Sequence, residues 1–115
     1  MQIEVTKLKV VVMIPPELVD SIREAACSNG AGVIGDYSYC TICTNCVGSF
    51  MPNENANPYV GEKLKLETVD EVKLEFICPI EKVKSVLSAI RSAHPYEEPG
   101  IDLFPMIDEE ALENC

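Results

Sequence analysis

The sequence predicts an α+β domain: a ferredoxin-like β-α-β-β-α-β plait, with one antiparallel four-stranded sheet and both helices on one face. Three observations predict this fold. The length of 115 residues suits one domain. Strand-like and helix-like stretches alternate along the chain. The two halves also repeat, because a shift of 64 positions places Pro15 on Pro79 and Ile22 on Val86, so each half reads strand, proline, helix, strand.

The first half begins with a strand at residues 7–14, where alternation gives way to the continuous apolar run of a strand covered on both faces. Pro15 and Pro16 stop it, and proline is tolerated in the first turn of the helix that follows. That helix has one apolar face and ends at Asn29-Gly30, since glycine readily adopts the left-handed cap. Residues 33–50 are rich in Tyr, Thr, Cys and Val, which predicts a second strand or a bent hairpin.

The second half begins after a surface loop at residues 51–61, which is rich in proline and asparagine. Residues 63–66 alternate briefly, residues 68–71 are polar, and residues 72–78 are predicted to be the third strand. Pro79 opens a second amphipathic helix that His94-Pro95 ends, because the residue before a proline leaves the helical region. Residues 101–107 supply the last strand. The domain therefore covers 1–107, and 108–115 form an acidic tail, frayed or in a short helical turn.

Composition excludes several classes of partner. The chain is 47% hydrophobic and carries a net charge of −10, which repels nucleic acid and anionic membrane surfaces. No apolar run approaches the ~20 residues that span a bilayer, and no export signal is recognisable, so we expect a soluble, cytoplasmic protein.

The six cysteines are then expected to be free thiols or metal ligands. With His94 as the single histidine, sites needing two imidazoles from one chain are excluded.

A sheet with both helices on one face leaves its other face and two edges bare. Apolar side chains occur on both faces of the first strand, at residues 10–14. Bare edges and a partly apolar open face favour self-association. The alternative is that residues 51–68 cover the second face within one subunit.

Four ordered motifs carry a resemblance to a known family: Gly-Ala-Gly-Val-Ile-Gly-Asp-Tyr at 30–37, Gly-Ser-Phe-Met-Pro at 48–52, Ala-Asn-Pro-Tyr-Val-Gly at 56–61 and Ala-His-Pro-Tyr-Glu-Glu-Pro at 93–99. Up to about residue 105 the chain resembles the inserted middle domain of the NIF-three-like family, the YqfO type. The last motif also resembles the signature of the CutA divalent-ion tolerance proteins. The resemblance implies a CutA/PII-like fold, a homotrimer and, here, a stand-alone protein. The hydrolase-like chemistry proposed for full-length relatives depends on flanking sequence and is not transferred.

The first candidate site is the Cys-x-x-Cys-x-x-Cys array of Cys40, Cys43 and Cys46. Cys40 matches a family position, whereas the other two look like additions. Such spacing binds zinc or an iron–sulfur cluster when a knuckle turns the sulfurs inward. In an extended strand Cys40 and Cys46 would instead share one side and Cys43 would point to the other. A fourth ligand would have to come from Cys27, Cys78, Cys115, His94 or a carboxylate, or the trimer axis could gather equivalent cysteines. The alternative is packed or loosely exposed thiols.

The second candidate site combines His94, Tyr96, Glu97 and Glu98, since an imidazole and two carboxylates can shuttle protons or hold a divalent ion. The structural alternative is a rigid turn set by prolines, in which Tyr96 packs and His94 caps the last carbonyls of the second helix.

Asn57 and Tyr59 belong to the loop motif, which we interpret either as ordinary turn chemistry or as part of a ligand cleft between subunits.

Three functions follow from these sites. The preferred one is a non-enzymatic PII/CutA-like oligomeric sensor or adaptor that binds a small ligand, a divalent metal ion or a partner protein, with no catalytic residue. The second is a thiol-based metal or redox module. The third, a small hydrolase, is suggested by family analogy alone. No cofactor is certain, and a divalent metal ion is the one candidate.

Overall fold

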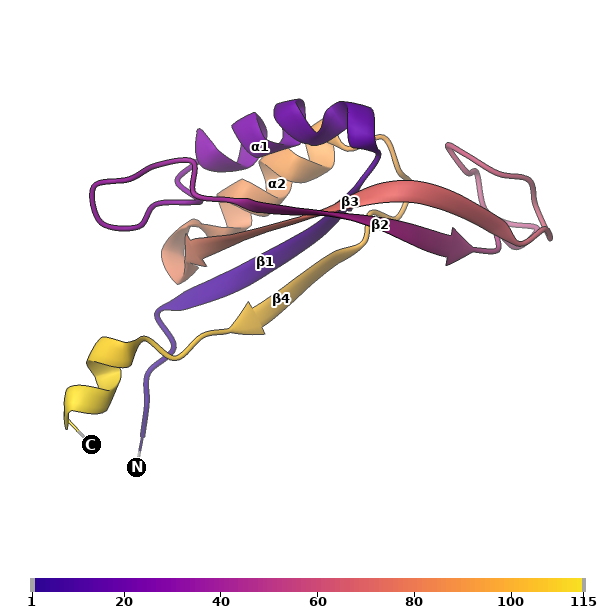
Figure 1. Cartoon of the computed structure of the whole chain (residues 1–115). Coiled ribbons are helices and arrows are strands. Elements are labelled where there is room, and N and C mark those ends of the chain that lie inside the picture. The colour runs from indigo at the N-terminus through magenta and orange to yellow at the C-terminus, as the bar shows by residue number, and fades with distance from the viewer. Residues whose placement is uncertain (1, 115) are drawn as a thin grey trace.

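The computed structural model describes residues 2–114. Four strands form one antiparallel sheet in the order β2-β3-β1-β4, and the helices α1 and α2 cover the same face of it (Figure 1). The strands are β1 (Lys7–Ile14), β2 (Ile42–Phe50), β3 (Glu67–Pro79) and β4 (Ile101–Pro105), and the helices are α1 (Val19–Cys27) and α2 (Val83–Ala93). The predicted β-α-β-β-α-β plait is therefore confirmed.

The repeated proline-helix unit has the same local structure in both halves. Each proline predicted to end a strand leads into a short 3-10 turn, η1 (Pro16–Leu18) and η2 (Ile80–Lys82), which continues directly into α1 or α2. Gly30, just beyond α1, has a φ of +106°, as the expected left-handed cap requires. β1 has the predicted bounds.

The core lies between the sheet and the helices. Its strand side chains come from the central strands: Val10 pairs with Phe76 and Val12 with Leu74, so all four share the face that the helices cover. Ile22 of α1 and the inward residues of α2 complete it. The most completely buried large side chains are Ile14, Ile22, Leu74, Ile90, Val10, Val12, Val86 and Cys78.

Two predicted boundaries are wrong. Residues 33–41 form a loop, closed by a bridge between Ile34 and Tyr37, so the second strand occupies the latter half of residues 33–50. β3 begins at Glu67, and the polar residues 68–71, which lay outside the predicted third strand at 72–78, pair with β2. The reason is that sheet hydrogen bonds use main-chain groups, so polar side chains are tolerated where a hairpin meets water.

The chain ends also differ slightly from expectation. β4 stops at Pro105, two residues early, and the tail forms a 3-10 helix, η3 (Glu109–Asn114). The tail is held near β1 by an ion pair of 3.2 Å between Lys7 Nζ and Asp108 Oδ2. Residue 115 lies outside the described residues. Among residues 2–114, no helix is long and apolar enough to cross a membrane.

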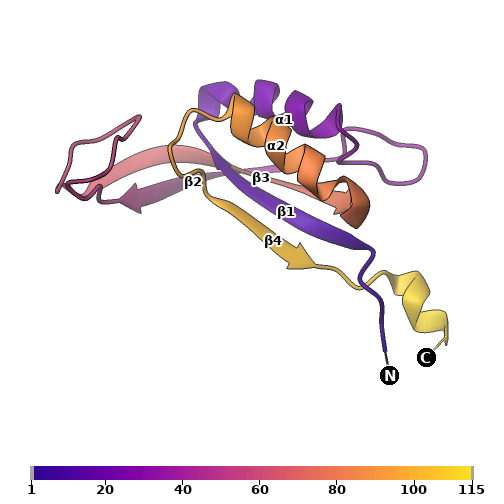
Figure 2. The same ribbon diagram turned by 180° about the vertical axis from the view of Figure 1, so that it is seen from behind.

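The loop between β2 and β3 covers only the far end of the sheet's open face, where Gly61 lies close to Phe50 and Glu67. Residues 51–66 lie beyond the far end of these strands, opposite the end that carries the loop of residues 28–41 (Figure 2). Apolar side chains remain exposed around the sheet: Val47 of β2 is 69% exposed and Phe104 of β4 is 52% exposed. Both edge strands therefore present uncovered apolar surface.

Candidate ligand-binding cleft

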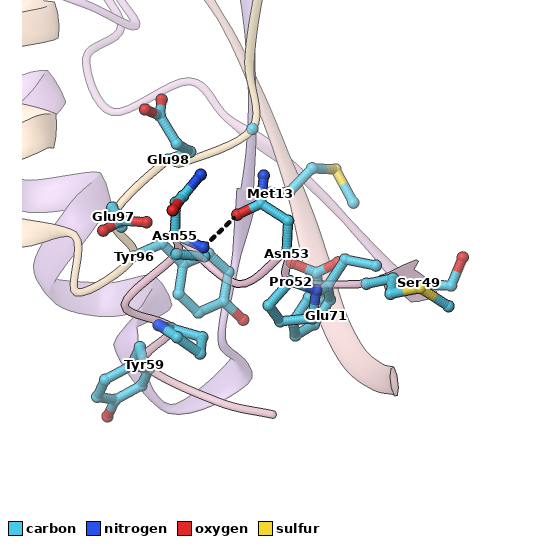
Figure 3. Close-up of a pocket in the computed structure, with 15 residues that line it drawn as sticks. Met13, Ser49, Pro52, Asn53, Asn55, Tyr59, Glu71, Tyr96, Glu97 and Glu98 are labelled. Atoms are coloured by element: carbon cyan, nitrogen blue, oxygen red, sulfur yellow. Dashed lines mark hydrogen bonds between the residues drawn. The ribbon is translucent and has the colours of Figure 1, made fainter. Parts of the chain in front are cut away.

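A cleft of about 620 Å³ lies where the 51–66 loop meets the turn after α2. Two sequence motifs far apart in the chain thus converge on one site. Figure 3 shows Tyr59, Tyr96 and Glu97 toward one side of the cleft, and Ser49 and Glu71 toward the other. The lining residues are Met13, Ser49, Phe50, Met51, Pro52, Asn53, Asn55, Ala56, Pro58, Tyr59, Glu71, Tyr96, Glu97, Glu98 and Gly100.

His94 is buried and holds the turn after α2 in place through two hydrogen bonds. Its side chain is 6% exposed, and its Nε2 lies 2.7 Å from the Met13 carbonyl oxygen. Its Nδ1 accepts a hydrogen bond of 3.2 Å from the Tyr96 main-chain N–H. With Nδ1 an acceptor, the ring proton must be on Nε2, which donates to Met13. The ring therefore fastens the turn to β1, rather than capping the last carbonyls of α2 as the structural interpretation expected.

The 51–66 loop is fastened to the same turn. The main-chain N–H of Asn57 donates to both carboxylate oxygens of Glu97, at 3.3 and 3.2 Å. Within the loop, the Asn55 N–H donates to Asn53 Oδ1 at 2.9 Å, an Asx turn. Gly61 closes the loop with a φ of +93°, where a Cβ would lie 2.8 Å from Glu67 Cγ. These bonds give the cleft a defined wall in the free protein.

Two tyrosines form part of that wall. The ring centroids of Tyr59 and Tyr96 are 6.0 Å apart and tilted by 50°. The Tyr96 ring also contacts the His94 ring, with centroids 4.8 Å apart and the planes tilted by 55°. Burial, and next the negative charge of Glu71, raise the pKa of the Tyr96 phenol. Tyr96 therefore offers a protonated hydroxyl and an aromatic ring at neutral pH.

Glu71 is a cleft-lining residue that sequence reasoning missed. It lies on the open face of β3, opposite Cys46, and a Cβ on Gly48 would collide with its Oε1. Among the described residues its carboxylate makes no hydrogen bond or ion pair, and partial burial raises its pKa. The apolar alternation of residues 72–78, continued back to residue 67, would have placed Glu71 on this face.

The predicted ligand-binding residues divide into two groups. Tyr59, Tyr96, Glu97 and Glu98 line the cleft directly. Asn57 and His94 do not line it, and each instead hydrogen-bonds a segment that does. The structure thus brings all six predicted residues to one region, in two different roles. Whether any of them contacts a ligand stays a prediction.

The three cysteines of the array do not converge. Cys43 faces the helices, where its Sγ accepts a hydrogen bond of 3.3 Å from Arg23 Nη2, whereas Cys46 lies on the open face with Sγ 3.5 Å from the Glu71 carbonyl oxygen. Cys40 precedes the strand, in the loop. Within residues 2–114, no group of three or more His, Cys, Asp or Glu side chains is placed to hold a metal ion. The metal hypothesis gains no support from one subunit.

The described cysteines outside the array are buried. Cys27 and Cys78 are free thiols, and burial raises the pKa of both. Protonated, enclosed thiols are poor nucleophiles and poor metal ligands. These two residues therefore serve packing at neutral pH.

Comparison with known proteins gives a consistent result. No protein-family model matches the sequence. The chain is 44% identical over 101 residues to a protein of Halalkalibacterium halodurans named GTP cyclohydrolase 1 type 2 homolog, covering 88% of this chain and 27% of that relative. A Bacillus cereus protein related to NIF3 superposes with a TM-score of 0.80 and 36% identity, over 94% of this chain and 27% of the other. CutA from Synechococcus elongatus superposes with a TM-score of 0.69 and 12% identity, over 98% and 88% of the two chains.

These similarities confirm the resemblance drawn from the four motifs. The chain is homologous to one segment of NIF3-related proteins, and its fold is CutA/PII-like. The chain spans only about 27% of the length of the Halalkalibacterium halodurans relative. The similarity to CutA is one of fold alone. The name GTP cyclohydrolase 1 type 2 homolog is that of the longer relative, and no activity is carried over from it to this chain.

Proposed function

We propose that this protein is a non-enzymatic CutA/PII-like sensor or adaptor that holds a small ligand in the cleft beside β3 and works as an oligomer in the cytoplasm. The convergence of the 56–61 and 93–99 motifs on one cleft carries the proposal. Its volume of about 620 Å³ lies within the ~300–1,000 Å³ of small-molecule sites. Apolar walls with a few polar groups are also typical of such sites.

Self-association is supported by the edges of the sheet. β2 and β4 each have one unpaired side, and Val47 of β2 and Phe104 of β4 are more than half exposed. Burying such edges against sister copies removes unpaired main-chain groups and apolar surface from water together. A homotrimer is the assembly that the family resemblance implies.

The two other functions have less support. A thiol-based metal or redox module would need Cys40, Cys43 and Cys46 to act together, yet the last two lie on opposite faces of β2. A hydrolase activity would be carried over from relatives of which this chain spans about 27%. Neither has an observation in its favour comparable to the cleft.

Native mass spectrometry of freshly purified protein, followed by a ligand-observed NMR screen of a small-molecule library, tests this function. Ala56→Phe places a ring in the cleft wall, and Ser88→Phe adds the same ring to the exposed side of α2 as the control. We expect several subunits per particle, and a ligand that binds wild type and Ser88→Phe but not Ala56→Phe. A lone subunit at micromolar concentration would refute the oligomer. Equal binding by Ala56→Phe would refute the cleft.

A further inference from the structure

The charge of the cleft wall restricts the ligand that it can take. Three carboxylates line it, those of Glu71, Glu97 and Glu98, and no Lys, Arg or His is among the described lining residues. Lys73, which pairs with Met13 across the sheet, is not among them either. A phosphate or carboxylate ligand would meet like charge on both sides of the cleft. The wall therefore favours a cation.

The remaining wall suits a cation that carries carbon. Tyr59 and Tyr96 present aromatic rings, and ammonium groups are attracted to such rings within about 6 Å of the centroid. Side chains of Met13, Phe50 and Met51 add apolar surface for an aliphatic chain. A bare metal ion would use none of these contacts.

The positions of the three carboxylates favour an extended ligand over a single metal ion. Glu71 belongs to β3, whereas Glu97 and Glu98 belong to the turn after α2, and within residues 2–114 no three or more His, Cys, Asp or Glu side chains are grouped to hold one metal ion. The Glu97 carboxylate already accepts the Asn57 N–H at both oxygens, whereas among the described residues the carboxylates of Glu71 and Glu98 accept no hydrogen bond and keep free acceptor capacity. Acceptors at separate points of one cleft suit a ligand with separate donors.

From these contacts we infer that the cleft binds an aliphatic polyamine, with one ammonium group on the Glu71 carboxylate and another between Tyr59, Tyr96 and the Glu97-Glu98 turn. This inference rests on the proposed function, because it names the ligand class of the same cleft. Alkyl ammonium groups are charged at neutral pH, as lysine is. Partial burial of Glu71, which raises its pKa, is offset when a positive group lies against it.

Spermidine is the probe, titrated into the full chain by calorimetry and by NMR of the amides of residues 49–59, 71 and 96–100. The titration is run in about 150 mM salt, which screens diffuse attraction to a chain of net charge −10. Glu71→Gln removes the carboxylate. Glu75→Gln is the matched control, because it makes the same charge change on the same face of β3 without lining the cleft.

Three further variants test the position of the Glu71 carboxylate and the aromatic ring of Tyr59 separately from charge. Gly48→Ala keeps Glu71 but forces its carboxylate to move. Tyr59→Leu removes an aromatic ring, whereas Tyr59→Phe retains it.

We expect Glu71→Gln to weaken spermidine binding roughly tenfold or more, and Glu75→Gln by less than about twofold. Gly48→Ala and Tyr59→Leu should each weaken spermidine binding about threefold or more, and Tyr59→Phe should bind nearly as wild type does.

Equal weakening by Glu71→Gln and Glu75→Gln would show general charge attraction and overturn the inference. AMP is titrated in the same way as an anionic probe, and its binding in the cleft without binding of spermidine would overturn the ligand class but leave the proposed function. Spermidine-induced amide shifts confined to residues outside the cleft would overturn the inference and leave the proposed function to its own test with Ala56→Phe.

Discussion

Along the two central strands, the helix-covered face of the sheet is apolar, whereas the open face mixes charged side chains with Val11, Met13 and Ile77. The helix-covered face presents Val10, Val12, Leu74 and Phe76, each at most 2% exposed. The open face of the same strands presents Lys9, Lys73, Glu71 and Glu75. Because side chains alternate along a strand, β1 and β3 hold the core on one side and the cleft on the other. Substitutions on the first face should therefore change stability, and those on the second should change binding.

Leu74→Ala should give the largest effect. It removes a side chain that is fully buried between the sheet and the helices, and such truncations cost about 2–5 kcal/mol. Leu66→Ala is the matched control, because Leu66, one residue before β3, is 66% exposed. Its free energy of unfolding should change by less than about 0.5 kcal/mol. Urea denaturation followed by circular dichroism measures both, and similar losses would contradict the division between the two environments.

His94→Ala should have an intermediate effect. The substitution leaves the Met13 carbonyl and the Tyr96 N–H without their partner, and unsatisfied buried groups cost about 1–3 kcal/mol. Ser92→Ala, two residues earlier, removes an exposed hydrogen bond to the Ser88 carbonyl and should cost less than about 0.5 kcal/mol. Nitrogen NMR of the wild-type ring should find the proton on Nε2. A proton on Nδ1 alone would contradict the role assigned to His94.

The sequence predicted the covered face far better than the open one. Apolar periodicity predicted one apolar face on each helix, and Ile22, Val86 and Ile90 are buried on those faces, because a packed core selects apolar residues. The extension of β3 to Glu67 escaped prediction, since main-chain pairing leaves little trace in polar side chains. The loop at residues 33–41 was predicted as strand or hairpin because it is rich in Tyr, Val and Ile. These residue types favour strands, but here they lie exposed in a loop.

The cleft was predicted in part, through the motifs of its two loops. Tyr59 and Tyr96 could be named from the resemblance, but nothing in the local pattern indicated that their rings meet. The bond from Asn57 to Glu97 joins residues 40 positions apart. Met13 and Glu71 enter the site from two different strands, as a consequence of the β1–β3 register. Contacts of this kind depend on tertiary packing, which single-sequence patterns do not encode.

Glu71→Gln should give the smallest change in stability, and its sign distinguishes a binding residue from a structural one. Partial burial raises the pKa of Glu71 in the folded state above its value in the unfolded chain. Its stabilising contribution is therefore present below the unfolded pKa of about 4.3 and is lost as pH rises through the folded pKa. At pH 7 the ionised carboxylate disfavours folding, so removing its charge should stabilise the protein slightly, by less than about 0.5 kcal/mol.

That gain should disappear as pH falls toward 4, where the wild-type carboxyl becomes neutral as well. Denaturation curves of wild type and Glu71→Gln at pH 4, 5.5 and 7 measure the difference. Glu75→Gln, on the same strand and face, controls for the change in net charge. A Glu71→Gln variant less stable than wild type at pH 7 would mean that the carboxylate stabilises the free protein. Such a result would remove the reason to expect that a bound cation offsets its burial.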